Sequence, residues 1–129
     1  MLEIAMDTSG KCVFQKQIAE NQEISIKYLD HIIHALKTTG LITAVRGRKS
    51  GYVLTRKPAK ISILDIHNAF EPGISVIECM SSNFKCHRSK RCAARRFWSR
   101  LNNMISDYFK TVTLQDMIDE QSALDDALN

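Results

Sequence analysis

The chain has 129 residues, of which 44% are hydrophobic, and a formal net charge of +4. This length suffices for one ordinary hydrophobic core but not for two independent domains of typical size. The N-terminal segment, which contains Glu3 and Asp7, does not predict a signal peptide, and no apolar run approaches the roughly 20 residues of a membrane span. We therefore expect a cytoplasmic protein whose cysteines are reduced.

Charge is distributed unevenly along the chain. Residues 1–60 carry ten Lys/Arg and five Asp/Glu, and residues 85–100 carry seven Lys/Arg and no acid. Residues 61–84 contain three acids and no Lys/Arg, and residues 101–129 contain six acids and one lysine. Two basic zones favour a polyanionic partner, although a basic surface can also be merely solvated.

Two helices joined by a tight turn are predicted first. Residues 14–22 have helical composition, with Ile18 and Ala19 facing inward. Ser25 is a candidate N-cap for a second helix, which ends at Gly40. The apolar residues of this second helix recur at helical spacing, which predicts that they are buried, and comprise Ile26, Leu29, Ile32, Ile33 and Leu36.

A basic hairpin is predicted to follow. Residues 41–56 alternate apolar and polar side chains around the sequence RGRKSG, in which Gly47 and Gly51 flank the tip. Helix, turn, helix and hairpin form a winged helix-turn-helix, in which the second helix enters the DNA major groove and hairpin cations reach phosphates or the minor groove. The candidate DNA contacts are Gln17, Ser25, Lys27, Tyr28, His31, Arg46, Arg48 and Lys49. The alternative is a small helical bundle in which the hairpin is only a connection.

The longest helical pattern covers residues 93–112. Its apolar stripe consists of Phe97, Leu101, Met104, Ile105, Tyr108, Phe109 and Val112. The stripe either packs on its own winged domain or pairs with the same helix of a second subunit, and a palindromic DNA site would favour twofold pairing. The sequence TLQD, Thr113 to Asp116, predicts a capping box for a short helix to about Glu120. The acidic tail that follows is expected to be loosely ordered or to pack lightly on the neighbouring subunit.

Three of the four cysteines lie close together in the sequence. Cys79, Cys86 and Cys92 are too widely spaced for the paired Cys-x-x-Cys of common zinc modules. Thiolates suit iron-sulfur clusters, and the surrounding Lys/Arg side chains would offset the negative charge of a cluster. A thiol-based redox sensor without a cluster and a zinc site remain alternatives. Cys12 is interpreted as a packing residue.

Several short motifs occur in a characteristic order: Ile18-Ala19-Glu20, Ile24-Ser25, Tyr28-Leu29, Leu36, Gly40-Leu41, Val45-Arg46-Gly47, Gly51-Tyr52-Val53-Leu54, residues 61–72 and the cysteine cluster. With these motifs, nearly the whole chain resembles the Rrf-two (Rrf2) family of bacterial winged-helix transcription regulators. That family includes the iron-sulfur cluster assembly regulator and the nitric-oxide-sensing repressor. The resemblance implies a homodimer that binds palindromic promoter DNA, with a 2Fe-2S or 4Fe-4S cluster on three cysteines.

The chain departs from the family pattern in three places. Ile4-Ala5 occupies the family's Leu-Ala position, so the first helix is expected to be truncated or short. Ser50 replaces the first of two wing glycines, and Arg95 stands where one branch of the family has a histidine ligand. The resemblance therefore leaves the fourth cluster ligand open among His87, Glu78, Asp7 and an outside thiol.

Together these patterns predict a mainly α protein with a small β-hairpin. We expect a winged helix-turn-helix over residues 1–72, a cysteine-rich sensor loop over 73–92, and a dimerisation helix with its tail over 93–129. The chain lacks the Cys-x-x-Cys pair and general-base constellation of a thiol oxidoreductase, so we do not expect an enzyme. We expect a DNA-binding regulator, a repressor more than an activator, whose operator binding responds to a cluster or to a redox or nitric-oxide signal.

Overall fold

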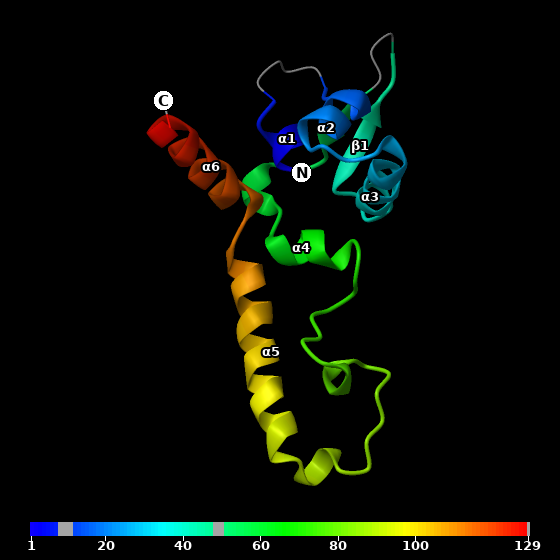
Figure 1. Cartoon of the computed structure of the whole chain (residues 1–129), viewed down its shortest axis with the longest axis vertical. Coiled ribbons are helices and arrows are strands. Elements are labelled where there is room, and N and C mark those ends of the chain that lie inside the picture. Colours follow the sequence, from blue (N-terminus) through cyan, green and yellow to red (C-terminus); the bar gives the residue numbers. More distant parts are fainter. Residues whose placement is uncertain (8–11, 48–50, 129) are drawn as a thin grey trace.

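A computed structural model describes residues 1–7, 12–47 and 51–128. It is mostly helical, with one two-stranded antiparallel sheet, which confirms the predicted fold class (Figure 1). The elements in chain order are α1 (Leu2–Ala5), α2 (Gln15–Asn21), α3 (Ile26–Thr38), β1 (Ile42–Val45), β2 (Gly51–Leu54), the 3-10 helix η1 (Pro58–Lys60), α4 (Ile63–Asn68), the 3-10 helices η2 (Glu78–Met80) and η3 (Ser89–Arg91), α5 (Ala93–Thr111) and α6 (Leu114–Leu128). No helix in these ranges is long and apolar enough to cross a membrane.

Helices α2 and α3 form the predicted helix-turn-helix. The Ser25 hydroxyl caps α3 by accepting a hydrogen bond from the Tyr28 backbone N–H at 3.1 Å. Glu23, with φ of 51°, turns the chain between the helices, and Gly40, with φ of 72°, follows the end of α3. As predicted, the inward-facing residues Ile18, Ala19, Leu29, Ile33 and Leu36 are buried in the core.

The inward placement predicted for Ile26 is wrong, because 51% of this side chain is exposed. Ile26 has the same helical phase as the buried residues Leu29, Ile33 and Leu36. It is, however, the first residue of α3 and lies beyond the edge of the core that covers the later turns. Helical phase alone therefore does not bury a side chain at a helix end.

Strands β1 and β2 form the predicted hairpin, with Thr43 opposite Val53 and Ala44 opposite Tyr52. Val13 extends this pairing, since its N–H and C=O bond Tyr52 at 3.2 Å and 2.9 Å respectively. A Cβ atom on Gly51 would lie 2.6 Å from the Val13 carbonyl oxygen and 2.8 Å from the Cys12 sulfur. Close packing therefore requires Gly51, and Cys12 is buried as predicted for a packing residue.

The chain leaves the winged-helix core and returns to it after α5. Ile61 and Leu114 are both fully buried, and the Leu114 N–H bonds the Ile61 carbonyl at 2.8 Å. The Ile63 N–H in turn bonds the Val112 carbonyl at 2.9 Å. Between these points α5 projects away from the core, and the segment after α4 runs out beside it (Figure 1). At 1.5 Å per residue, the 19 residues of α5 form a projecting arm about 28 Å long.

The predicted capping box of α6 is present, but the predicted end of the helix at Glu120 is wrong. The Asp116 carboxylate accepts bonds from the Thr113 N–H and hydroxyl, both at 2.7 Å. The helix then continues to Leu128. Residues 121–128 contain no glycine or proline, and Gln121 donates to Asp125 one turn later at 2.8 Å. These local preferences extend the helix even though its outer turns are exposed.

Candidate nucleic-acid interface and cysteine loop

The exposed face of α3 carries the predicted contact residues of the second helix. Lys27, Tyr28 and His31 are all exposed, and Lys27 and His31 lie on the side of α3 away from its buried residues. Tyr28, in the first turn of α3, is 60% exposed. These residues place a cation, a phenol hydroxyl and an imidazole near the N-terminus of the helix, where a helix-turn-helix meets base edges.

Two neighbouring residues modify this predicted surface. The Ser25 hydroxyl oxygen accepts the capping bond, and its proton remains available for donation to a phosphate or a base. Ile26 was missed as a contact candidate because its helical phase suggested burial. As an exposed apolar group at the start of α3, it has the chemistry to contact a thymine methyl group.

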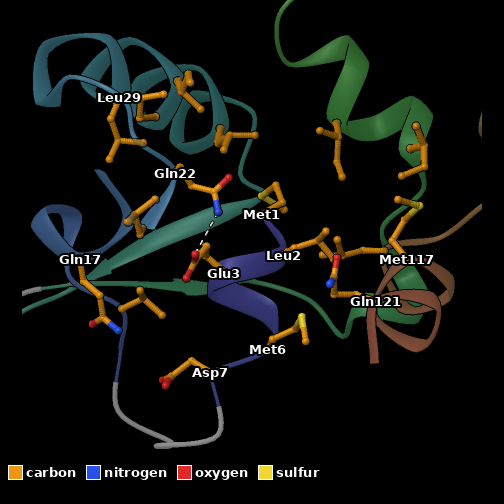
Figure 2. Close-up of a pocket in the computed structure, with 18 of the residues that line it drawn as sticks. Met1, Leu2, Glu3, Met6, Asp7, Gln17, Gln22, Leu29, Met117 and Gln121 are labelled. Atoms are coloured by element: carbon orange, nitrogen blue, oxygen red, sulfur yellow. Dashed lines mark hydrogen bonds between the residues drawn. The ribbon is translucent and has the colours of Figure 1, made fainter. Parts of the chain in front are cut away.

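Gln17 is exposed on α2 and lies at a groove that Tyr28 also lines. Figure 2 shows Gln17 at the margin of this groove, away from Leu29. Gln15 Nε2 donates a hydrogen bond to the Asp30 carboxylate and so links α2 to α3. Gln17 therefore sits on a helix that is fixed against α3.

The hairpin is anchored to the end of α3. Thr55 follows β2, and its hydroxyl donates to the Gly40 carbonyl while its N–H bonds the Leu41 carbonyl at 3.2 Å. Arg46 is exposed where β1 ends, so its guanidinium is presented on a hairpin that is fixed relative to α3. Arg48 and Lys49, the other predicted wing contacts, lie outside the described residues, as does Ser50.

The three clustered cysteines occupy different local structures along the arm. Cys79 lies in η2, Cys86 lies in the following loop, and Cys92 is the N-cap of α5. The Cys92 sulfur accepts a bond from the Arg95 N–H at 3.3 Å. All three side chains are half-buried. The N-terminal end of α5 carries a partial positive charge and faces the Cys92 sulfur. This charge would stabilise a negatively charged ligand bound to that sulfur.

The structure does not gather these cysteines into a metal site. Among the described residues, which include all three cysteines, no group of three Cys, His, Asp or Glu side chains is placed to hold a metal ion. By donor type the loop fits an iron-sulfur cluster, because it offers three thiols among exposed cations. The cations that surround the thiols are Lys85, Arg88, Lys90, Arg91 and Arg96, all exposed, and Arg95, half-buried.

The candidate fourth ligands differ in their position. Glu78 and His87 are exposed within the cysteine loop itself. Asp7 instead follows α1 and lines the groove near the winged-helix core (Figure 2). The loop lies at the far end of α5 from α1 (Figure 1), so Asp7 is remote from the cysteines of its own subunit.

The arrangement of α2, α3 and the hairpin defines a winged-helix DNA-binding protein, and comparison with known proteins places it among transcriptional regulators. A B. subtilis structure, CymR (YrzC), described as the global cysteine regulator, is similar with a TM-score of 0.74 and 27% identity over 92% of this chain and 87% of that one. The T. potens IscR structure also gives a TM-score of 0.74, with 28% identity over 93% and 78% of the two chains.

The family follows from the sequence matches. Residues 1–120 match the Rrf2 model, described as an iron-dependent transcriptional regulator. A putative HTH-type transcriptional regulator of Neisseria meningitidis is 34% identical over 122 residues, which is 95% of this chain and 82% of the relative. The chain belongs to the Rrf2 family. Its relatives are transcriptional regulators and not enzymes. This confirms the predicted family and the prediction that the chain is not an enzyme.

Proposed function

We propose that this Rrf2 protein represses transcription by binding palindromic operator DNA as a homodimer. The observation that carries the proposal is the capped α3, whose first turns expose Lys27, Tyr28 and His31. Arg46 is exposed at the end of β1 in the adjoining hairpin. In this proposal α3 reads the major groove, and Ile26 adds an apolar contact to a thymine methyl. Gln17 and Ser25 contact the DNA backbone near the helix entrance, and Arg46, Arg48 and Lys49 contact phosphates or the minor groove.

The homodimer is supported by an uncovered face of α5. Phe97, Met104 and Tyr108 are 60%, 69% and 67% exposed, and their spacing of seven and four residues places them on one side of the helix. Phe109 is half-buried on another side and makes an edge-to-face contact with His67 of α4, with ring centroids 5.8 Å apart. One side of α5 is thus packed within the subunit, and the other is available for a second subunit.

We further propose that the cysteine loop sets operator affinity by holding an iron-sulfur cluster on Cys79, Cys86 and Cys92. A bound cluster would supply electron transfer and reactivity toward oxygen and nitric oxide. The loop's own residues would ligate it through three thiolates, and the surrounding arginines and lysines would balance its charge. The sulfurs are not gathered in the structure, so cluster binding requires the loop to draw them together. Direct oxidation of these half-buried thiols, without a cluster, is the alternative.

Operator binding is tested by gel-shift selection with genomic fragments in the presence of competitor DNA. A regulator of this type should retain a small set of fragments that resist competition. Uniform loss of all fragments would show only non-specific binding to a polyanion.

The cluster is tested separately by anaerobic purification, an ultraviolet-visible spectrum, and iron and sulfide assays. A brown protein with broad absorption and matched iron and sulfide would support the cluster. A colourless protein without iron, in which the three loop thiols react freely with a thiol reagent, would favour the thiol sensor.

A further inference from the structure

The chain turns at Gly73, between α4 and the cysteine loop, and the end of α4 holds this turn. The Gly73 N–H donates to the Asn68 side-chain oxygen at 3.0 Å. The His67 Nε2 lies 3.0 Å from the Gly73 carbonyl oxygen. Because a carbonyl oxygen only accepts, Nε2 carries a proton in this contact. Two adjacent side chains thus hold both backbone polar groups of one residue, and we call His67, Asn68 and Gly73 the Gly73 clamp.

The backbone conformation of Gly73 restricts which residues can occupy the turn. Its φ is 78°, in the left-handed region that glycine adopts readily and alanine does not. A Cβ atom at Gly73 would meet no atom within 4 Å. The restriction therefore comes from the conformation and not from crowding. Asparagine enters this region more easily than alanine, so the two substitutions can test the turn without a steric clash.

At its other end, α4 is fixed to the winged-helix core. The Ser62 hydroxyl accepts a bond from the Asp65 N–H at 3.0 Å, and the Asp65 carboxylate accepts one from the Ser62 N–H at 2.9 Å. Ile61, just before this capping box, is fully buried. Ile66 and Ala69 then pack against the buried cluster to which α3 contributes. A movement of the clamped end of α4 therefore displaces side chains on the packing that supports α3.

On the other side of the clamp, the chain leads directly to the cysteine loop. Figure 1 shows α4 between the winged-helix core and the segment that runs out to this loop. The Val76 N–H bonds the Asn102 side chain of α5 at 3.1 Å, and Cys79 follows Gly73 by six residues. A rearrangement that draws Cys79 toward the other loop thiols therefore pulls on a segment that begins at the clamp.

The clamp can open without unfolding α4. Asn68 and Gly73 are exposed and His67 is half-buried, so water can replace both hydrogen bonds. Bonds of this kind contribute little to net stability. The capping box and the apolar contacts of α4 do not involve the clamp residues. The clamp is therefore suited to a contact that opens and closes with the state of the loop.

We propose that the Gly73 clamp transmits the state of the cysteine loop to the winged helix, with His67 and Asn68 as positioning residues. A rearranged loop opens the clamp and releases the end of α4, and Ile66 and Ala69 then shift on the core that supports α3. This inference rests on the proposed function, because it names the route by which the loop changes operator affinity. The route lies within one subunit and does not require the α5 interface.

The route is tested without DNA by NMR hydrogen exchange on the full chain. The reduced protein is compared with protein treated with diamide, which takes one hydrogen atom from each of two thiols and leaves a disulfide, until the loop thiols no longer react with a thiol reagent. We expect the Gly73 and Phe70 amides to exchange at least about fivefold faster after treatment, because their bonds at the end of α4 are released. Unchanged exchange of both amides would overturn the proposal.

Matched variants distinguish the clamp from a merely structural contact. Asn68→Ala removes the acceptor, Asn68→Asp keeps an oxygen there, and His67→Phe removes the donor but keeps a ring beside Phe109. Asn68→Ala and His67→Phe, when reduced, should already bind operator with the affinity of the oxidised original chain. Diamide should then change their affinity by less than about twofold, against about tenfold for the original chain and for Asn68→Asp.

A structural role would give a different result. If Asn68→Ala lowers the affinity of both states equally, so that the ratio between them is kept, the clamp only stabilises the fold and the proposal is wrong. The same holds if Asn68→Ala behaves in every respect as the original chain does. Asn103→Ala, an exposed asparagine of α5, is the control and should retain the full response. Thermal unfolding of each variant checks that the fold is kept.

Substitutions of Gly73 test the backbone conformation of the turn. Gly73→Ala should behave as Asn68→Ala does, whereas Gly73→Asn should retain most of the diamide response. Equal responses of the two variants would contradict the role of the turn. If the original chain binds no operator, the proposed function fails, and the exchange measurement still decides whether the clamp opens with the loop.

Discussion

At the scale of single residues, Arg46 offers the most direct test of the wing. It is exposed at the described end of the hairpin, and we assign it a phosphate contact. Arg46→Ala should weaken binding to all DNA sequences alike and lower the slope of log affinity against log salt by about one. Fluorescence anisotropy over a range of salt concentrations measures both effects. Lys110→Ala, an exposed cation on α5, is the control, and an unchanged salt dependence in Arg46→Ala would exclude the contact.

Ile26 should contribute to sequence preference and not to general affinity. Because its side chain is 51% exposed, Ile26→Ala should leave thermal stability nearly unchanged. The substitution should weaken binding to the best operator by about 1 kcal/mol and reduce discrimination at one thymine position. Competition among single-base operator variants provides the measurement. Equal weakening for every variant would assign Ile26 a non-specific role.

Residue-scale prediction from the sequence succeeded where local chemistry alone decides the structure. Ser25 caps α3 because its hydroxyl can reach the Tyr28 N–H three residues ahead, whatever the rest of the fold. Gly51 is different: it is required by the approach of Cys12 and Val13, which are distant in sequence. The exposure of Ile26 depends likewise on where the core ends, which no local pattern encodes.

At the scale of elements, the cap of α6 makes the start of this helix sensitive to acid. Hydrogen bonds from the Thr113 hydroxyl and N–H lower the pKa of the exposed Asp116 carboxyl. The cap is therefore fully formed above the ordinary carboxyl pKa near 3.9, and it is lost as pH falls through the lower folded-state value. Thr113→Ala should raise the pKa of Asp116 toward its ordinary value. An NMR titration of the carboxyl carbon detects this, and an unchanged pKa would exclude the bonds in solution.

The uncovered face of α5 makes a second prediction at this scale. Met104→Asp places a charge at the centre of the exposed apolar stripe and should convert a dimer to a monomer, because a buried unpaired charge is strongly unfavourable. Analytical ultracentrifugation gives the mass. Asn103→Asp, also exposed on α5, is the matched control and should remain dimeric. A wild-type chain that is monomeric at high concentration would exclude the α5 interface.

The sequence indicated the type of each major element more reliably than its extent or partners. The stripe on α5 was predicted, but only the structure shows that Phe109 packs on α4 while Phe97, Met104 and Tyr108 remain exposed. The length of α6 was underestimated because its outer turns are exposed and lack the apolar periodicity that marks a packed helix. Cysteine spacing gave donor types but not whether the sulfurs converge, since loop conformation depends on contacts outside the motif.

At the scale of the whole molecule, α5 lies between the proposed DNA-binding region and the proposed sensor loop. The winged helix lies near one end of this helix and the cysteine loop lies beside the other (Figure 1). The Val76 N–H bonds the Asn102 side chain at 3.1 Å, so the segment leading to the cysteines is attached to α5. A rearrangement of the loop can therefore act on the helix that we propose joins the two subunits, and a small movement there would change the separation of the two recognition helices.

Control of operator affinity by the cysteine loop is the central claim. Its most direct test is titration of an operator fragment with protein purified anaerobically, before and after exposure to oxidant, for the original chain and for Cys86→Ser. Cys86 is half-buried in the loop, so this variant should remain folded. We expect oxidant to change the operator affinity of the original chain by about tenfold and to leave that of Cys86→Ser unchanged. Equal responses of the two proteins, or no response in either, would contradict the claim.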